Sequence, residues 1–382
     1  MTKEELFAVM EQIAEEREAA RPIVRELAES GRQIDDIEIP EGWRTAGMVV
    51  ELCEFAYGHL ETDPLKCLSF SLLSVAIAAG VHVSRYPNPI SSCLAGHSWR
   101  HLGWSHRYSN KYDAAHRAFD AARSFFSSAP PLTYELGLLL YAKASILLLE
   151  LRTTDACDSI AAARQIFSEF GDLRRQNHCD ILLGLGRWTV GDLDGAREFF
   201  EKALQSTASL DDPYTIGSIC NGLGRIYHRL GKTADAVLTL ERGREIFAGL
   251  DMPSEVTRVN WGIAQVLLGT GDAERALLLL EPIRADFLSR HMPEEAGEVG
   301  LHIVDALVAT GQLETAKRLA TQVLNEFVDA QLNVYAIQAL GYLRDLLETT
   351  GDPKRVVRHV SSYVEKLDNE PELIFLPIPD RV

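Results

Sequence analysis

The chain of 382 residues has little of what marks secretion, membrane insertion or disulfide bonding. Its six cysteines form no C-x-x-C pair and show no metal-ligand spacing, so we interpret them as reduced thiols of a cytoplasmic protein. The N-terminus lacks a basic start followed by an apolar run, which predicts no secretory signal. The longest apolar stretches, 68–81 and 138–151, are shorter than a membrane span requires, and no membrane association is expected.

Positive charge is also scarce. Lys and Arg number 38 against 55 Asp and Glu, and the net charge is −17. Since nucleic-acid binding requires a basic face, this balance argues against nucleic acid as a direct partner.

Motifs for catalysis are missing as well. The sequence contains no G-x-S-x-G and no H-E-x-x-H. The tripeptide 231–233, Gly-Lys-Thr, imitates the end of a phosphate-binding loop, but Ile226 stands where that loop needs a glycine, and a helix precedes it instead of a strand. The sequence therefore predicts no catalytic residues, no cofactor and no enzymatic activity.

Three histidines of one predicted helix are the best candidates for a metal site. His97 and His101 are four residues apart, with His106 one turn further, and such a pair can hold zinc. No acidic or cysteine ligand nearby has a matching spacing, and a third ligand would have to come from elsewhere. We predict that the protein has no metal site.

The most informative feature of the sequence is a repeat. A glycine recurs every 40 residues, and a small residue follows it five positions later. We interpret each unit as a helix that ends at the glycine, which accepts a left-handed backbone, and a second helix whose alanine permits close packing. A fixed period of this kind predicts a solenoid. The glycines are Gly191, Gly231, Gly271, Gly311 and Gly351, and the small residues are Ala196, Ala236, Ala276, Ala316 and Val356.

The repeated pattern resembles the tetratricopeptide repeat (TPR) over about residues 44–366. The residues that carry the resemblance are Leu223-Gly224 with Tyr227, Gly231 and Ala236, Leu183-Gly184 with Phe200 and Ala203, and Leu102-Gly103 with Phe119 and Ala122. The unit has 40 residues instead of the common 34 or so. Long units are similar to those of scaffold TPRs of the Leu-Gly-Asn type, of kinesin light chain and of bacterial regulators that sense peptides. The segment 369–375 also resembles the tail of uncharacterised bacterial TPR proteins.

The predicted fold class is all-α: a right-handed α-solenoid of about eight TPR-like helical hairpins with an N-terminal helix. Residues 1–42 are expected to form that helix and an acidic linker, 43–366 a single elongated solenoid domain, and 367–382 an extended Pro-rich tail. Residues 81–92 are an insertion with two prolines where helix is not expected, either a slack loop or a lip over the groove. The tail either covers the last helix or is an exposed docking strand.

The resemblance implies that the first helix of each hairpin lines a concave groove. The residues expected to face it are rich in Arg, His, Trp and Tyr. Arg supplies forked donors for carboxylates, aromatic residues supply rigid contact area, and Asn can pair with a peptide amide. Asn221 and Arg225 are the first choices. An alternative, that the three tryptophans are simply repeat core, stays open. The predicted partner-binding residues are Arg100, Trp104, Arg107, Tyr108, Tyr141, Trp188, Asn221, Arg225, His228, Arg258 and Trp261.

These observations predict a non-enzymatic TPR scaffold that binds a protein or peptide with an acidic segment in its groove. The alternative is a peptide-responsive bacterial regulator, a sensor that acts on a separate effector protein. A third hypothesis, an enzyme or metalloprotein, has no motif to support it. Neither the identity of the partner nor the oligomeric state follows from the sequence.

Overall fold

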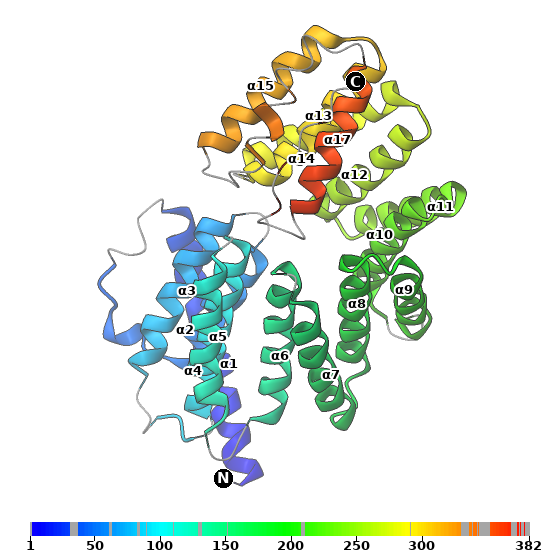
Figure 1. The fold of residues 1–382 in the computed structure, drawn as a ribbon. Coiled ribbons are helices and arrows are strands. Elements are labelled where there is room, and N and C mark those ends of the chain that lie inside the picture. Colours follow the sequence, from blue (N-terminus) through cyan, green and yellow to red (C-terminus); the bar gives the residue numbers. More distant parts are fainter. Residues whose placement is uncertain are drawn as a thin grey trace. The chain divides into compact units, whose positions relative to one another are not determined.

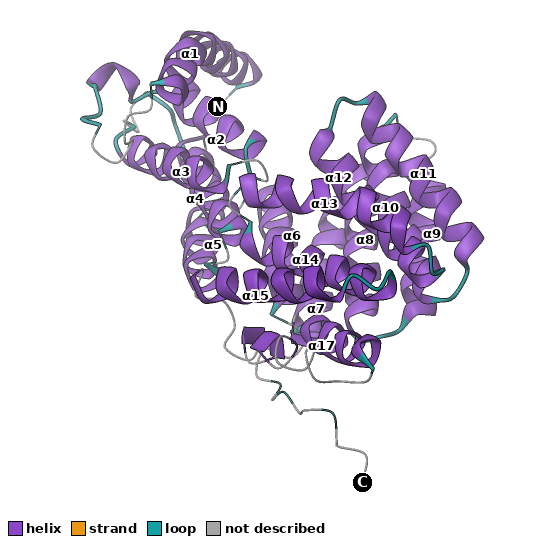
Figure 2. Ribbon diagram, turned by 90° about the horizontal axis from the view of Figure 1, so that it is seen from above, coloured by secondary structure: helices purple, strands orange, loops and turns teal. Residues whose placement is uncertain are grey.

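All regular secondary structure that the computed structural model describes is helical (Figure 2). Within this described part, no helix combines the length and the apolar character that crossing a membrane requires. The described residues are 2–30, 37–60, 63–81, 85–88, 90–109, 111–128, 132–150, 152–207, 211–290, 292–329, 336, 337, 339–341, 343, 352–367, 373, 375 and 378.

A long N-terminal helix, α1 (Lys3–Glu29), and a 3-10 turn, η2 (Glu41–Trp43), precede a series of paired helices (Figure 1). Seven complete pairs and one further helix lie in the described part of the chain, and the all-α repeat architecture is confirmed. They are α2 (Ala46–Gly58) with α3 (Pro64–Ala79), α4 (Ile90–Tyr108) with α5 (Tyr112–Phe126), α6 (Thr133–Leu149) with α7 (Thr153–Glu169), α8 (Leu173–Thr189) with α9 (Leu193–Thr207), α10 (Pro213–Arg229) with α11 (Thr233–Gly249), α12 (Pro253–Gly269) with α13 (Ala273–Ser289), and α14 (Pro293–Ala309) with α15 (Leu313–Asp329), followed by α17 (Pro353–Leu367).

The chain divides into two compact units. Unit 1 comprises Met1–Leu147 and Thr154–Cys179, and unit 2 comprises Leu148–Thr153 and Asp180–Val382. Each unit has buried clusters of its own, built from residues on consecutive helices. The expectation of a single elongated domain over 43–366 stays a prediction.

The turn between α10 and α11 shows why the repeat needs its glycine. Gly231 has φ 72°, in the left-handed region that side chains disfavour. Its N–H donates to the His228 carbonyl, and the next N–H, of Lys232, donates to the Tyr227 carbonyl at 2.8 Å. These two bonds satisfy the last carbonyls of α10 and form a Schellman motif. The equivalent glycines at 191, 271 and 311 also have positive φ, whereas Gly351 lies outside the described residues.

A second glycine of the motif is required by close packing. A Cβ on Gly224 would lie 2.5 Å from Cγ of Leu240 and 3.3 Å from the carbonyl oxygen of Ala236. In unit 1, a Cβ on Gly103 would lie 2.2 Å from the ring of Phe119. Contacts this short are too close for any side chain, so the predicted tight crossing of the two helices is confirmed.

The insertion at 81–92 is not slack where the structure describes it. Tyr86 is fully buried, and its hydroxyl lies 2.6 Å from the Glu16 carboxylate and 3.2 Å from the Ala46 N–H. The insertion is therefore fastened to α1 and to the start of α2. It is also shorter than expected, because α4 begins at Ile90.

Replacing Tyr86 with Phe should destabilise unit 1 by about 2 kcal/mol, since Glu16 loses a buried donor. Burial by itself would raise the pKa of Glu16, but hydrogen bonds from Tyr86, Gln12 and the Gly47 N–H and the charge of Arg85 outweigh it and lower that pKa. The stabilisation is therefore complete above about pH 5 and shrinks as the pH falls below about 4.

Urea unfolding of the wild type and of Tyr86→Phe, at pH 7 and again at decreasing pH, measures both effects. Tyr57→Phe is a matched control, because its side chain is 57% exposed. An equal loss of stability in the two variants would contradict the role of Tyr86.

The described residues of the tail lie on the last helix. Leu373, Phe375 and Ile378 pack against the apolar cluster that includes α17. The Tyr363 hydroxyl donates to the Leu373 carbonyl at 2.5 Å, and the rings of Tyr363 and Phe375 are 4.8 Å apart. Of the two expectations for the tail, these residues match the one in which it covers the last helix.

Candidate functional site

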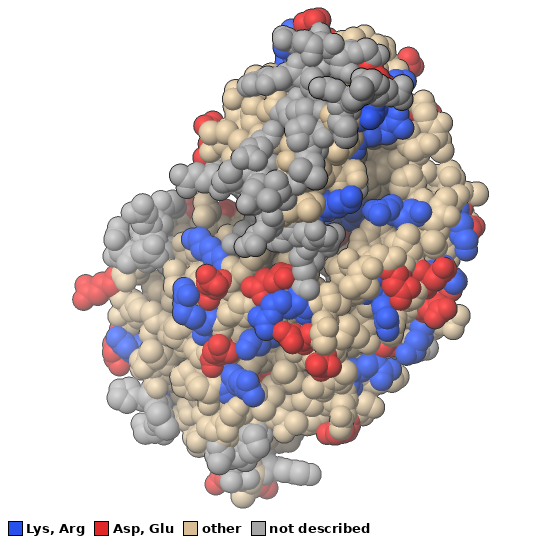
Figure 3. Space-filling view, in the orientation of Figure 1, with Lys and Arg blue, Asp and Glu red and all other residues tan. Residues whose placement is uncertain are grey.

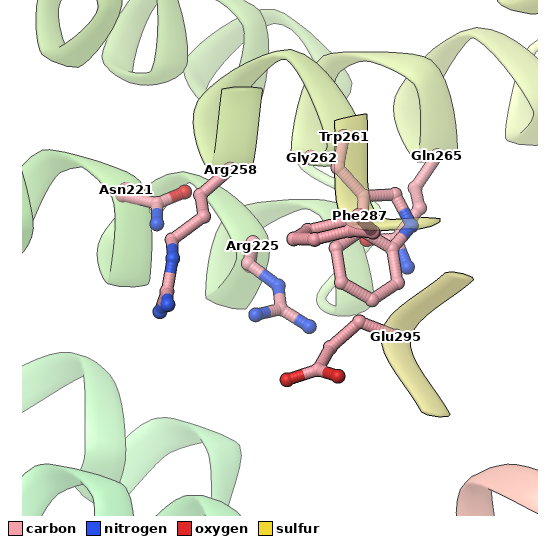
Figure 4. Close-up of a pocket in the computed structure, with 8 residues that line it drawn as sticks. All are labelled: Asn221, Arg225, Arg258, Trp261, Gly262, Gln265, Phe287 and Glu295. Atoms are coloured by element: carbon pink, nitrogen blue, oxygen red, sulfur yellow. The ribbon is translucent and has the colours of Figure 1, made fainter. Parts of the chain in front are cut away.

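A cavity of about 120 Å³ opens in unit 2 among the first helices of consecutive pairs. On one common measure a water needs roughly 10–15 Å³, so the cavity has room for a larger chemical group. Figure 4 shows Arg225 and Glu295 pointing toward one another, with Asn221 and Arg258 to one side of them. The lining residues are Asn221 and Arg225 of α10, Arg258, Trp261, Gly262 and Gln265 of α12, Phe287 of α13 and Glu295 of α14.

The aromatic wall of this cavity is held by contacts between helices. The ring of Trp261 meets Phe287 edge to face at 5.8 Å, and its Nε1–H donates to Nδ1 of His302 at 3.3 Å. The Gln265 amide lies 3.4 Å from the other ring nitrogen of His302. Burial and then the charge of Arg225 lower the pKa of His302 to about 4, against a smaller opposing effect of the Glu298 carbonyl. His302 is therefore neutral at physiological pH.

Basic side chains continue from the cavity along α10. The guanidinium groups of Arg225 and Arg229 lie 5.9 and 5.6 Å from the ring of Trp188, within range of cation–π attraction. In Figure 3 basic side chains are visible in the hollowed region over α10 and α12, at the upper right. Unit 2 thus presents a face on which arginines lie next to tryptophans.

Two further predicted residues, His228 and Asn221, belong to this face. His228 packs so closely against α12 that a Cβ on Gly269 would lie 2.8 Å from its ring, and burial followed by Arg229 and Arg225 lowers the pKa of His228. The Asn221 amide oxygen is buried and accepts no hydrogen bond from the residues described here. A buried acceptor left unpaired costs roughly 1–3 kcal/mol, which a donor from a ligand would recover.

The structure therefore brings six predicted residues together in unit 2. Four of them, Asn221, Arg225, Arg258 and Trp261, line the cavity, and Trp188 and His228 lie beside it through their contacts with α10 and α12. Whether these side chains contact a partner stays a prediction.

The other five predicted residues lie in unit 1. Arg100 is buried, forms an ion pair with Glu135 and lies over the ring of Phe126. The guanidinium of Arg107 lies 4.6 Å from the Tyr108 ring and 5.4 Å from that of Trp104.

Trp104 itself packs against two core clusters of unit 1, as the core alternative proposed. The ring of Tyr141 is 6.3 Å from that of His178. A binding role for the unit 1 residues stays untested.

The sequence prediction missed Glu295, Phe287 and His302. His302 lies four residues after Glu298 and three before Asp305 on α14, so helical spacing places all three on one face. That spacing was the signal by which His302 could have been found.

The histidine pair of unit 1 is close enough to share a ligand, but among the described residues no further His, Cys, Asp or Glu completes a metal-binding group with it. The Nε2 atoms of His97 and His101 are 2.9 Å apart, and burial lowers both pKa values. Among the residues that the structure describes, no group of three or more His, Cys, Asp or Glu side chains could hold a metal ion.

No protein-family model and no curated protein sequence matches this chain. Similar solved structures exist nonetheless. The Rap conjugation gene regulator of the plasmid pLS20, in complex with the Phr* peptide, matches 85% of this chain and 96% of its own with a TM-score of 0.58 at 15% identity. Aspartyl phosphate phosphatase F from Bacillus subtilis matches 91% of this chain and 92% of its own, with a TM-score of 0.50 at 14% identity.

A third similar structure is the signal transduction ATPase (STAND) protein with a tetratricopeptide repeat sensor from Pyrococcus horikoshii. It matches 88% of this chain and 54% of its own, with a TM-score of 0.51 at 13% identity. At these identities the likeness shows the fold alone. The chain has a TPR-like helical-repeat fold, as the sequence motif predicted.

Proposed function

We propose that this protein is a non-enzymatic binding protein of the cytoplasm, which holds a peptide or an extended segment of a protein partner on unit 2. The observation that carries the proposal is the cavity between α10, α12 and α14, where two arginines and an asparagine face a wall of Trp261 and Phe287. Aromatic and Arg side chains in a partly desolvated pocket are the usual anchors of a peptide interface.

The charge of this face favours a ligand that is acidic in part. Among the charged residues that line the cavity, Arg225 and Arg258 are positive and Glu295 is negative, and Arg229 adds a positive charge beside them on α10. The whole chain carries −17 and repels an acidic ligand at long range, so recognition has to come from these local contacts. Binding should therefore depend on direct contact with the arginines and change little through long-range attraction.

Similar structures support a peptide as the ligand. The Rap regulator of pLS20, which shares this fold, is described as a complex with a peptide. That support concerns the kind of ligand, because no residue of the Rap regulator is carried over to this chain. A catalytic role is not part of the proposal, although one protein of similar fold is named a phosphatase.

A second candidate function is a peptide-responsive bacterial regulator, in which the bound peptide changes the shape of the repeat array and thereby its affinity for a separate effector. One protein of similar fold is named a gene regulator, and another is named a signal transduction ATPase with a tetratricopeptide repeat sensor. A ligand shifts such an equilibrium only by its differential affinity for the two shapes. Small-angle scattering that shows contraction on adding a bound peptide would favour the regulator over a rigid scaffold.

Affinity selection from random heptapeptide libraries tests the proposed function directly. Immobilised wild-type protein is expected to enrich a family of peptides that contain Asp or Glu, with micromolar Kd. Arg318→Glu on α15 is a matched charge reversal on an exposed residue outside the cavity, and it should leave the enrichment unchanged. Failure of the wild type to enrich any peptide family would reject the proposal.

A further inference from the structure

His302 is not among the residues that line the cavity, yet it contacts two that do. It lies on α14, and its ring meets that of Trp261 at 6.1 Å with an angle of 72°. The Trp261 Nε1–H reaches Nδ1 of His302, and the Gln265 amide faces Nε2. The imidazole of His302 thus contacts both Trp261 of the aromatic wall and the side-chain amide of Gln265.

The direction of the hydrogen bonds follows from the chemistry of the three groups. An indole N–H can only donate, so Nδ1 of His302 carries no proton. A neutral imidazole then has its proton on Nε2. The Glu298 carbonyl, one turn earlier on α14, also acts on the ring, but the side chain that faces Nε2 is that of Gln265, at 3.4 Å. Of its amide, only the oxygen can accept this proton. The two ends of a carboxamide exchange by rotation and are assigned from the bonds they make. With its oxygen turned to His302, Gln265 keeps its amino group for the cavity.

The cavity wall then offers more donors than acceptors, and its acceptors are the Asn221 oxygen and the Glu295 carboxylate. Arg225 and Arg258 have no acceptor atoms, and the amino group of Gln265 adds two further N–H bonds. A ligand group that fits here has to supply acceptor oxygens, as a peptide carboxylate or a backbone carbonyl does. Protonation of His302 would break this arrangement of hydrogen bonds, because its Nδ1 could no longer accept the Nε1–H of Trp261.

We infer that His302 is a positioning residue that sets the hydrogen-bonding direction of the unit 2 cavity, so that the cavity selects peptide groups with acceptor oxygens. The inference deepens the proposed function and rests on it. His302 acts through Trp261 and Gln265, and it need not touch the ligand.

The first experiment examines the geometry without any ligand. In protein labelled with ¹⁵N-tryptophan, the indole signal of Trp261 is assigned by its loss in Trp261→Phe. In His302→Phe this signal should move upfield and its proton should exchange faster with water, since the acceptor is gone. In the wild type the signal should stay constant from pH 8 to 6 and move only toward pH 4, where His302 takes up a proton.

The second experiment measures binding of a peptide that the wild type selects from random heptapeptide libraries, made with free and with amidated C-termini. His302→Phe is expected to weaken that peptide about tenfold, because Gln265 loses its fixed orientation. His302→Gln, whose amide nitrogen can take the place of Nε2 and donate to Gln265, should recover most of the affinity. His359→Phe on α17, whose ring lies against Phe375, is the matched control and should bind like the wild type.

The outcomes separate this inference from the proposed function. If the wild type selects no peptide from either library, the proposed function is rejected, and an unchanged Trp261 signal in His302→Phe would reject the positioning role by itself. If peptides are selected but His302→Phe binds them as tightly as the wild type, the positioning role is wrong while the peptide site stands. Selection from the free-acid library alone would identify the terminal carboxylate as the acceptor, and selection from both would identify side-chain or backbone oxygens.

Discussion

The double variant Arg225→Glu, Trp261→Ala is expected to lose all measurable binding of a selected peptide while its circular dichroism spectrum stays that of the wild type. Arg225 lines the cavity of unit 2 and also lies over Trp188, and Trp261 forms its aromatic wall. Hot-spot residues of this kind each contribute about 2 kcal/mol or more. Together they correspond to roughly a thousandfold loss of affinity.

Fluorescence anisotropy with a labelled peptide measures this loss. Reversing one charge also tests the sign of the ligand, because Arg225→Glu by itself should weaken acidic peptides much more than neutral ones, and less so at high salt. The exposed Arg318→Glu serves as the control for net charge. Undiminished binding by the double variant would show that the cavity between α10 and α12 is not the binding site.

Removing one partner of the buried ion pair in unit 1 should cost more stability than any other single change proposed for this protein. The side chains of Arg100 and Glu135 are only 9% and 23% exposed, and the pair joins α4 to α6. Glu135→Ala leaves the Arg100 guanidinium buried without its carboxylate, which destabilises by about 3–5 kcal/mol. Urea unfolding followed by circular dichroism gives the difference in the free energy of unfolding.

A double replacement separates the cost of an unpaired charge from the worth of the pair. Arg100→Met with Glu135→Leu removes both charges and keeps the apolar contact over Phe126, so its stability should return to within about 1 kcal/mol of the wild type. A double variant as unstable as Glu135→Ala would show that the loss of stability does not come from the unpaired charge of Arg100. Unchanged stability in Glu135→Ala would mean that the ion pair does not hold α4 to α6.

The same pair shows where helical spacing stops being informative. Spacing places Arg100, three residues before Gly103, and Arg225, one residue after Gly224, on the same face of their first helices, and both are predicted to bind a partner. In the structure Arg225 is exposed at a cavity, whereas Arg100 is buried against a carboxylate 35 residues away. A helical period predicts the face of a residue, but it contains nothing about which side chain of the next repeat lies opposite.

The insertion at 81–92 makes a related point. Prolines and polar residues indicate a loop, and this much was predicted correctly for its first part. Nothing local distinguishes Tyr86 from an exposed tyrosine, because its burial depends on Glu16, which is 70 residues earlier in the chain.

By itself the sequence determined the helical hairpins, the glycine turns inside them and the close crossings of their helices. These depend on interactions within some twenty residues, namely a left-handed glycine at the turn and a glycine opposite a large side chain, as at Gly231 and Gly224. Only the tertiary structure decided which side chains meet in unit 2. The cavity joins residues of α10, α12, α13 and α14, and its wall depends on His302, 41 residues from Trp261. Such contacts arise where one hairpin packs on the next. A local sequence pattern does not show which residues some 40 positions apart will meet there.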